Sequence, residues 1–248
     1  MTTTDFRAVL TDMPLSYGSH DPVEEPGEAC VMEKVSILYA LSMGLDPIKN
    51  FTDLPFCTND VIALTAQEVN DGAEDRKRQR LNALIPRLLR ARKAGGLERR
   101  VTITMTLTMI ERHLRDFSIA DGVSHLDQAE SQARAACAEV HRYLDGELNE
   151  RQMKYRLDKA MAAGDYAAVR VYQIATSTSN HRTQEACARV TNSLVYETPG
   201  DPMVLLDELL DVHEECRIKE GIDIYTPEAW EDAALAFVNE YMSEKEAV

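Results

Sequence analysis

Apolar residues recur at helical spacing along most of this chain, and Pro, Gly and capping residues separate one such run from the next. An apolar stripe runs from Val31 to Leu38, and Gly44 ends it. Comparable stripes predict helices over the ranges 58–69, 74–93, 124–148, 150–161, 165–177, 180–196 and 203–218, with one more from residue 226. The sequence therefore predicts an all-α fold, a single compact domain of about nine or ten helices.

The run from Val101 to Ile119 has two interpretations. Its first residues alternate between Thr and apolar side chains, a pattern typical of a β-strand. However, the run is longer than a usual strand, and Leu107, Ile110 and Leu114 also fit a helix. We favour a buried helix and keep a short strand near 101–108 as the alternative.

Turn-forming residues suggest how the chain is divided. Residues 1–25 contain several Pro and Gly and are expected to form an irregular N-terminal arm. Residues 26–198 are expected to form a helical core, in which Pro86 should split the helix at 74–93 into two pieces. A Pro-Gly-Asp-Pro turn then begins residues 199–248, which we expect to be an acidic C-terminal helical pair packed on the core.

Charge is distributed unevenly along the chain. The 248 residues carry a formal net charge of −15 at pH 7. Residues 76–100 hold ten Lys or Arg and one acidic residue, a net charge of +9, which leaves −24 for the remainder. Such an acidic chain is not expected to bind nucleic acids or anionic membranes in general. We expect the basic run to lie against acidic surface, either the chain's own C-terminal third or a second subunit.

Three features bear on the cellular compartment. No apolar run reaches the roughly 18–20 residues that a membrane-spanning helix needs. The first ten residues lack a basic region followed by an apolar one, so we expect no signal peptide. The five cysteines are odd in number and lack paired spacing, which is typical of reduced thiols in a cytosol. We therefore predict a cytoplasmic protein with no membrane partner and no disulfide.

Three short motifs follow one another between residues 18 and 92. The first is a His followed by Gly-x-x-Cys-x-Met-Glu-x-Val, the second is Asp-x-Pro-x-Cys, and the third is Asn-Asp-Gly followed by Leu-Ile-Pro-Arg-Leu. They are carried by His20, Gly27, Cys30, Met32, Glu33, Val35, Asp53, Pro55, Cys57, Asn70, Asp71, Gly72, Leu84, Ile85, Pro86, Arg87 and Leu88. Over this range the chain resembles a family of uncharacterised proteins from actinobacteria and their phages.

The resemblance implies a source rather than an activity, because no function is established for that family. Beyond residue 92 the likeness is limited to helical, alanine-rich sequence. Members of the family often carry a His after the Asp of the second motif, whereas this chain has Leu54 there. This difference counts against a metal site. If a phage encodes the protein, the expected location is the host cytoplasm.

The candidate ligands of a metal ion are His20, Cys30, Glu33, Asp53 and Cys57. Thiolate, imidazole and carboxylate groups together suit zinc. However, the chain has no Cys-x-x-Cys and no His-x-x-x-His motif, so the signal has little specificity. We favour the alternative, in which both cysteines are small buried residues and Glu33 caps a helix or pairs with an Arg. No metal and no cofactor is predicted.

Two further hypotheses concern single residues of this region. We expect Arg87 to pair with Glu33, because a buried carboxylate needs a charged partner. Cys30 is a candidate nucleophile in the first helical turn, where the thiol pKa falls, with His20 as its base. We favour an inert cysteine, since no protease signature surrounds it.

His213 and Cys216 are three residues apart and can share a helix face. Two ligands make only half of a metal site. The two glutamates between them indicate a solvated face, which is the interpretation we favour.

The basic run is a candidate binding surface for phosphates. Its residues are Arg76, Lys77, Arg78, Arg80, Arg87, Arg90, Arg92, Lys93, Arg99 and Arg100. Leucines and an isoleucine at helical spacing show that one face of the run packs inward, and no aromatic residues for base stacking lie between the cations. A nucleic-acid interface therefore ranks below a contact with acidic protein surface.

No catalytic motif is visible in the sequence, and the charges are segregated. We therefore predict a non-enzymatic helical interaction or regulatory protein, of phage or actinobacterial origin, which binds a macromolecular partner or itself. One alternative is a small-molecule or metal-dependent protein with a pocket around Cys30, Glu33 and Arg87. The other is a nucleic-acid-binding protein that uses the run at 76–100.

Overall fold

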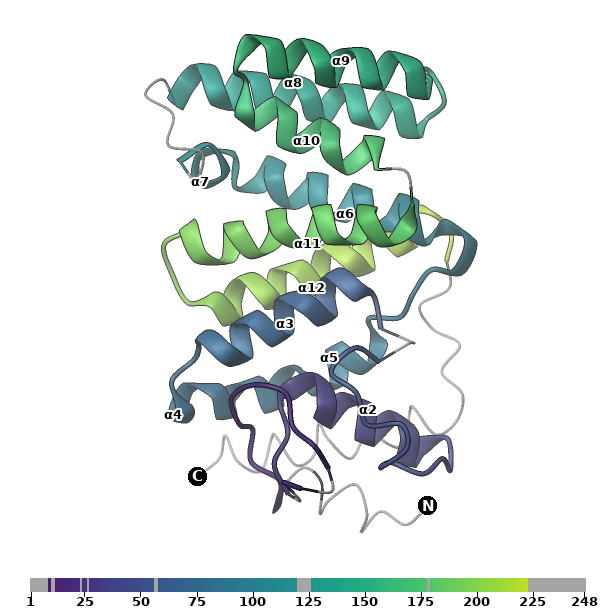
Figure 1. The fold of residues 1–248 in the computed structure, drawn as a ribbon, viewed down its shortest axis with the longest axis vertical. Coiled ribbons are helices and arrows are strands. Elements are labelled where there is room, and N and C mark those ends of the chain that lie inside the picture. Colours follow the sequence, from purple (N-terminus) through teal and green to yellow (C-terminus); the bar gives the residue numbers. More distant parts are fainter. Residues whose placement is uncertain are drawn as a thin grey trace. The chain divides into compact units, whose positions relative to one another are not determined.

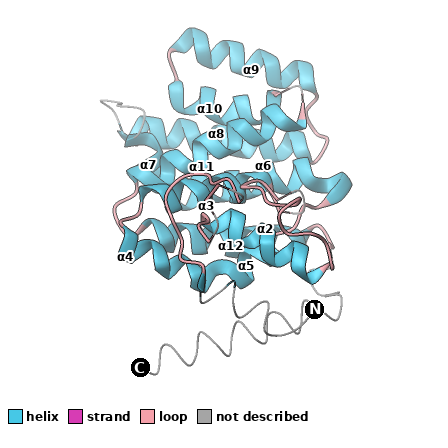
Figure 2. Cartoon of the chain, turned by 60° about the horizontal axis from the view of Figure 1, so that its bottom comes forward, coloured by secondary structure: helices cyan, strands magenta, loops and turns pink. Residues whose placement is uncertain are grey.

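The structure, a computed structural model, describes residues 9, 12–22, 24–25, 27–55, 58–119, 126–177 and 179–222. Over these residues the chain forms helices joined by loops and turns, so the all-α prediction is confirmed (Figure 2). No helix among them is long and apolar enough to cross a membrane.

The chain divides into two compact units. Unit 1 comprises Met1–Lys93 and Gly221–Val248, and unit 2 comprises Ala94–Glu220. This division falls inside the stretch 26–198 that the sequence suggested as one core. The first helix of the expected C-terminal pair belongs to unit 2, and the second lies outside the described residues.

The helices of unit 1 are α2 (Val31–Ser42), α3 (Asp60–Gly72), α4 (Asp75–Arg78), η1 (Gln79–Leu84) and α5 (Ile85–Arg90). Within this unit α2 packs against α3 and α5. Every residue of α2 from Val31 to Leu38 is buried, so this helix is enclosed on all sides. The interruption predicted at Pro86 is observed: this residue lies in the first turn of α5, where its missing N–H costs no helical hydrogen bond.

The helices of unit 2 are η2 (Gly95–Leu97), α6 (Glu98–Arg112), α7 (Leu114–Ile119), α8 (Leu126–Leu144), α9 (Glu150–Ala163), α10 (Tyr166–Thr176), α11 (Asn180–Glu197) and α12 (Pro202–Lys219). They are stacked from α9 and α8 through α10, α6 and α11 to α12 (Figure 1). Side-chain caps fix where four of them begin, since Asn149, Asp165, Ser179 and Asp201 each accept a hydrogen bond from the first turn.

Helix α6 is the centre of unit 2. Every residue from Val101 to Leu107 is buried, and the helix packs against α8, α10, α11 and α12. The alternation of Thr and apolar residues therefore reflects burial on all sides, and the alternative of a strand at 101–108 is wrong. A buried Thr is accommodated because its hydroxyl bonds within the helix: Thr106 Oγ1 donates to the Thr102 carbonyl at 3.0 Å.

Candidate functional site

Three of the predicted site residues meet in unit 1, around the carboxylate of Glu33. His20 Nδ1 lies 2.8 Å from Glu33 Oε2, and the main-chain N–H of His20 donates to Glu33 Oε1 at 2.8 Å. The N–H of Cys30 donates to Glu33 Oε2 at 2.7 Å. The side chains of His20 and Glu33 are only 4% and 2% exposed. The result is a buried network in which one carboxylate binds two chain segments.

Glu33 also fixes the start of α2. Cys30 is the N-cap residue, and its Sγ accepts a hydrogen bond from Glu33 N–H at 3.4 Å while the Glu33 side chain binds back to Cys30 N–H. This reciprocal arrangement is a capping box. The prediction that Glu33 caps a helix is confirmed, but the choice of Arg87 as its partner is wrong. His20 takes that place, and Arg87, half-buried on α5, interacts elsewhere.

The remaining candidates for a metal ion do not join this network. Asp53 accepts a hydrogen bond from Ser19 Oγ at 2.8 Å, at an exposed position. Cys57 lies outside the described residues. No group of three or more His, Cys, Asp or Glu side chains in the described part of the chain is placed to hold a metal ion.

The thiol of Cys30 is unsuited to nucleophilic chemistry. Burial, together with the negative charge of Glu33, raises the pKa of this thiol to about 12. Burial likewise raises the pKa of Cys137 and Cys187 to about 12, and that of Cys216 to about 11. All four thiols are free and buried. The hypothesis of a nucleophilic Cys30 is therefore not supported.

These four thiols should be unreactive in the native protein and fully reactive after unfolding. In a Cys57→Ser variant, we expect a colorimetric thiol reagent at pH 8 to titrate almost none of them without denaturant. In guanidinium chloride without a reductant, all four should react. Rapid native labelling of any one would contradict its burial, and fewer than four thiols after unfolding would reveal a disulfide.

The Glu33 carboxylate is part of a larger arrangement that holds the main chain of residues 13–20. These residues, the N-terminal segment, lie across α2, α3 and η1. Five side chains of those helices bind main-chain groups of the segment and are called the docking row: Glu33, Lys34, Asn70, Asp71 and Gln79. All of them belong to unit 1.

Gln79 and Asn70 show how the docking row works. Gln79 Oε1 accepts the Leu15 N–H at 3.0 Å, and Gln79 Nε2 donates to the Leu15 carbonyl at 2.7 Å. Asn70 Nδ2 donates to the carbonyl of Ser16 at 2.8 Å. Every residue except Pro carries this main-chain donor and acceptor. The docking row therefore recognises main-chain groups more than a particular sequence.

Lys34 is, with Gln79, a member of the docking row that the sequence analysis missed. It is 0% exposed, although it is charged, and its Nζ donates to the Met13 carbonyl at 2.7 Å and to Asn82 Oδ1 at 2.8 Å. A lysine is rarely buried in this way unless its ammonium group is bound. The available signal was its position inside the otherwise apolar run from Val31 to Leu38.

Two side chains of the N-terminal segment are buried as well. Leu15 is 3% exposed and forms a short parallel bridge with Ala29, to which Ser16 N–H donates at 2.9 Å. The His20 side chain forms the second anchor, through Glu33. Tyr17, between them, is 69% exposed. The segment is thus held by its main chain and by an apolar and a polar anchor.

Ser16, His20 and Glu33 lie in the order of a nucleophile, a base and an orienting acid. Ser16 Oγ is 3.0 Å from His20 Nε2, and His20 Nδ1 contacts Glu33. However, Ser16 Oγ also lies 3.4 Å from the Ala29 carbonyl, and the imidazole is almost fully buried. This order of side chains allows proton transfer from Ser16 to His20, but the buried imidazole leaves little room for a substrate.

The basic run does not form one helix. It is divided between unit 1 and unit 2 at Lys93, and among α4, η1, α5, η2 and the start of α6. Arg76 and Arg90 are exposed. Arg80, Arg87 and Arg92 each take part in interactions. The run therefore cannot act as a single basic helix.

Three cations of the run in unit 1, Lys77, Arg78 and Lys93, have partners within unit 1. Arg78, which is buried, donates to the Asn70 and Ala73 carbonyls at 2.8 and 2.7 Å and to Asp75 at 2.7 Å. Lys77 lies 3.6 Å from Glu74, and Lys93 lies 2.6 Å from Asp60. These acids do not belong to the C-terminal third that the sequence suggested.

In unit 2 one pair does join the run to the acidic C-terminal third. Arg100 contacts Glu220 at 2.7 Å and Asp145 at 2.8 Å. The Arg100 guanidinium lowers the pKa of the Asp145 carboxyl by hydrogen bonding. Arg99 instead donates to the Ala175 carbonyl at 2.7 Å. Arg100 thus makes the predicted kind of contact with the C-terminal third.

His213 and Cys216 face inward, which corrects the expectation of a solvated face. They are 2% and 5% exposed, whereas the side chain of Glu215 between them is 58% exposed. Burial, and then the charge of Arg217, lowers the pKa of His213 to about 3. Among the described residues, His213 Nε2 has no hydrogen-bond partner. The pair does not form a metal site within the described residues.

Comparisons with protein-family models, with curated proteins and with solved structures found no match for this chain. The resemblance to proteins of actinobacteria and their phages stays a prediction. The geometry of the site is therefore the basis for a functional proposal.

Proposed function

We propose that this chain is a non-enzymatic helical interaction protein that binds a polypeptide segment on its docking row. In the free chain the N-terminal segment occupies the row. A partner binds by supplying a segment that takes the place of the N-terminal segment on the docking row. The observation that supports this is the set of hydrogen bonds from the docking row to main-chain groups of residues 13–20.

Main-chain recognition of this kind suits a protein ligand. Hydrogen bonds to the peptide groups contribute affinity, and a few side-chain contacts contribute specificity. Here the side-chain contacts are those of Leu15 and His20, the apolar and the polar anchor of the N-terminal segment. A nucleic acid offers neither the alternating N–H and C=O groups nor an apolar anchor.

The partner that this geometry favours is a second copy of the same chain. The segment that fits the docking row is Met13–His20 itself, so an identical segment from another molecule fits equally well. Exchange of an identical element between protomers is a low-cost route to a dimer. The stretch 21–28 that joins the segment to α2 contains Pro22 and Gly27, the latter at a positive φ of 94°. Extending this stretch would carry the segment to a neighbouring molecule.

The competing functions have less support in the described residues. A metal-dependent role lacks a set of ligands. A nucleic-acid interface at 76–100 lacks the single basic helix that it was predicted to use, because the described residues of the run are divided among several helices. The arrangement of Ser16, His20 and Glu33 is buried together with the segment and contributes to holding it.

The test is binding of the N-terminal segment as a separate peptide. A fluorescent peptide with the sequence of residues 12–22 is added to the full chain and to a Leu15→Asp variant. The variant loses the burial of Leu15, worth about 2 kcal/mol, so its own segment leaves the docking row more often. Because apparent affinity scales with the fraction of open sites, we expect the variant to bind the peptide at least about tenfold more tightly than the wild type.

Matched controls make this result specific. A peptide carrying Leu15→Asp should bind neither protein, and Gln79→Ala in the Leu15→Asp background should abolish binding of the native peptide. If Leu15→Asp disturbs folding by circular dichroism, Leu15→Ala replaces it. Equal affinity of wild type and variant, or no binding to a folded variant, overturns the proposal. Light scattering then tests whether wild-type mass rises with concentration.

A further inference from the structure

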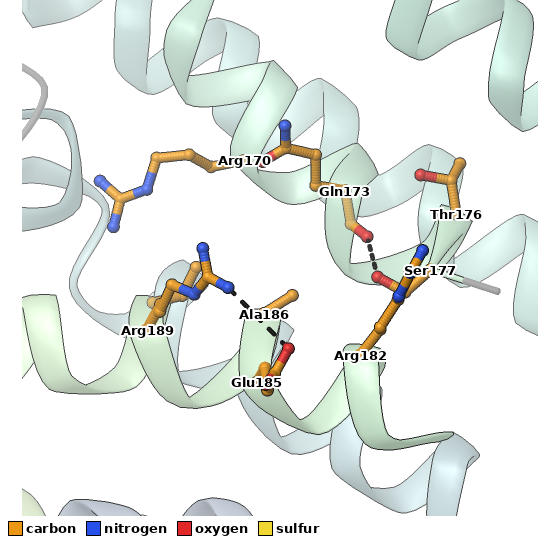
Figure 3. A pocket seen from close by; sticks show the side chains of 9 residues that line it. Arg170, Gln173, Thr176, Ser177, Arg182, Glu185, Ala186 and Arg189 are labelled. Atoms are coloured by element: carbon orange, nitrogen blue, oxygen red, sulfur yellow. Dashed lines mark hydrogen bonds and ion pairs between the residues drawn. The ribbon is translucent and has the colours of Figure 1, made fainter. Parts of the chain in front are cut away.

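A second site, in unit 2, has different ligand chemistry. A cavity of about 500 Å³ lies between α10 and α11, and arginines line it (Figure 3). Arg170 comes from α10, and Arg182 and Arg189 come from α11. The sequence analysis missed it, although Arg182 and Arg189 are seven residues apart and therefore lie on one face of their helix.

The lining of this cavity is positively charged, in a chain whose net charge is −15. Three arginines and a single acidic residue, Glu185, are among the residues that line it. This carboxylate already has neighbours, since its oxygens lie 3.9 Å from Nη2 of the cationic Arg189 and 3.2 Å from His181 Nε2. The excess of positive charge favours an anionic ligand.

The arginines are arranged in two groups. Figure 3 shows the guanidinium groups of Arg170 and Arg189 toward one end of the cavity and that of Arg182 toward the other, near Ser177. Arg170 is held in position, because it donates to Ser193 Oγ at 2.9 Å and its guanidinium carbon lies 4.6 Å from the centre of the Phe117 ring. An arginine fixed in this way loses less side-chain entropy when it binds a ligand.

The spacing of the two groups identifies the class of ligand. Seven residues of helix rise about 10 Å, so Arg182 and Arg189 leave the helix about that far apart. A single phosphate ion is too small to reach both. In a polyproline II conformation, with three residues per turn and a rise of about 3.1 Å per residue, two carboxylates three residues apart lie on the same side of the peptide and about 9 Å apart. We infer that this cavity binds an acidic polypeptide segment whose carboxylates are spaced to reach both groups.

This inference is independent of the docking row, which lies in unit 1 and recognises main chain. Here the recognition depends on acidic side chains and should weaken with salt. Raising the ionic strength from 0.05 to 0.3 M shortens the screening length from about 14 to about 6 Å.

The experiment compares two fluorescent peptides of the same composition by anisotropy with the full chain. One has glutamates three residues apart with glycines between them, and the other has all its glutamates adjacent at one end. At 0.05 M salt we expect the spaced peptide to bind about fivefold more tightly, and at 0.3 M both should weaken. A single-stranded RNA of equal charge and inorganic phosphate serve as competitors.

Charge-reversal variants assign the site. Arg182→Glu with Arg189→Glu should weaken binding of the spaced peptide by about tenfold or more. Both side chains are exposed, so folding should be preserved. Arg151→Glu with Lys159→Glu, two exposed changes on α9 with the same total change of charge, is the matched control and should have little effect beyond the change in net charge. Equal loss in control and double variant, no preference for spaced glutamates, or tighter binding of the RNA overturns the inference.

Discussion

A Glu33→Ala variant is expected to unfold at a lower urea concentration, with a free energy of unfolding reduced by about 4 kcal/mol. The substitution removes the acceptor of three hydrogen bonds, two from His20 and one from Cys30. The donors stay buried without a partner, which costs more than the loss of the bonds alone. It also breaks the capping box of α2 and releases one end of the N-terminal segment. Urea denaturation at pH 7, followed by circular dichroism, measures the change.

Glu28→Ala is the matched control for this prediction. Glu28 lies 3.8 Å from the other ring nitrogen of His20, but its side chain is 58% exposed. A contact with an exposed carboxylate contributes at most about 1 kcal/mol even when both groups are charged, so the control should lose little stability. Similar losses of unfolding free energy in the two variants would contradict the stabilising role of the Glu33 carboxylate.

The second large effect concerns pH and His213. In the folded chain the pKa of this residue is about 3, against 6.5 as its ordinary value, so the unfolded state binds a proton that the folded state does not. The neutral form is the stable one in the fold. The stability that the neutral imidazole contributes to the fold is therefore fully present above pH 6.5 and is lost as the pH falls toward 3. Between pH 7 and pH 4 the loss should be about 3 kcal/mol.

Carboxylates also titrate in this range, so the test is a difference between proteins. His213→Leu keeps the volume of the side chain approximately and removes the titration. Its stability relative to wild type should therefore rise by about 3 kcal/mol as the pH falls from 7 to 4. His181→Gln, at a side chain that is 81% exposed, should give no comparable trend. A constant difference between His213→Leu and wild type would show that His213 does not titrate as its burial requires.

The helices were predictable where their ends carry local signals. Asn149, Asp165 and Ser179 cap helices in the structure, and Gly164 ends one at a positive φ of 69°. These signals act within a few residues, so sequence alone contains them. The run at 101–108 left two interpretations open because burial on all sides removes the polar face that distinguishes a helix.

The candidate site was predictable only in part. Glu33 was expected to cap a helix or to pair with an Arg, and the first of these is observed. The partner His20 lies in an irregular segment, and no periodicity relates it to α2. The docking row draws on three helices, so it depends on their packing. The arginine-lined cavity likewise needs α10 and α11 side by side, which no spacing within one helix reveals.

The central position of α6 has a consequence for biosynthesis. This helix, Glu98–Arg112, leaves the ribosome before α11 and α12, the helices of unit 2 that cover much of its surface. Translation at about 5–20 residues per second leaves its apolar side chains uncovered for several seconds while the later helices are made. We expect nascent chains that end before Asn180 to be bound by chaperones or degraded, and longer ones to become protease-resistant once α12 has emerged.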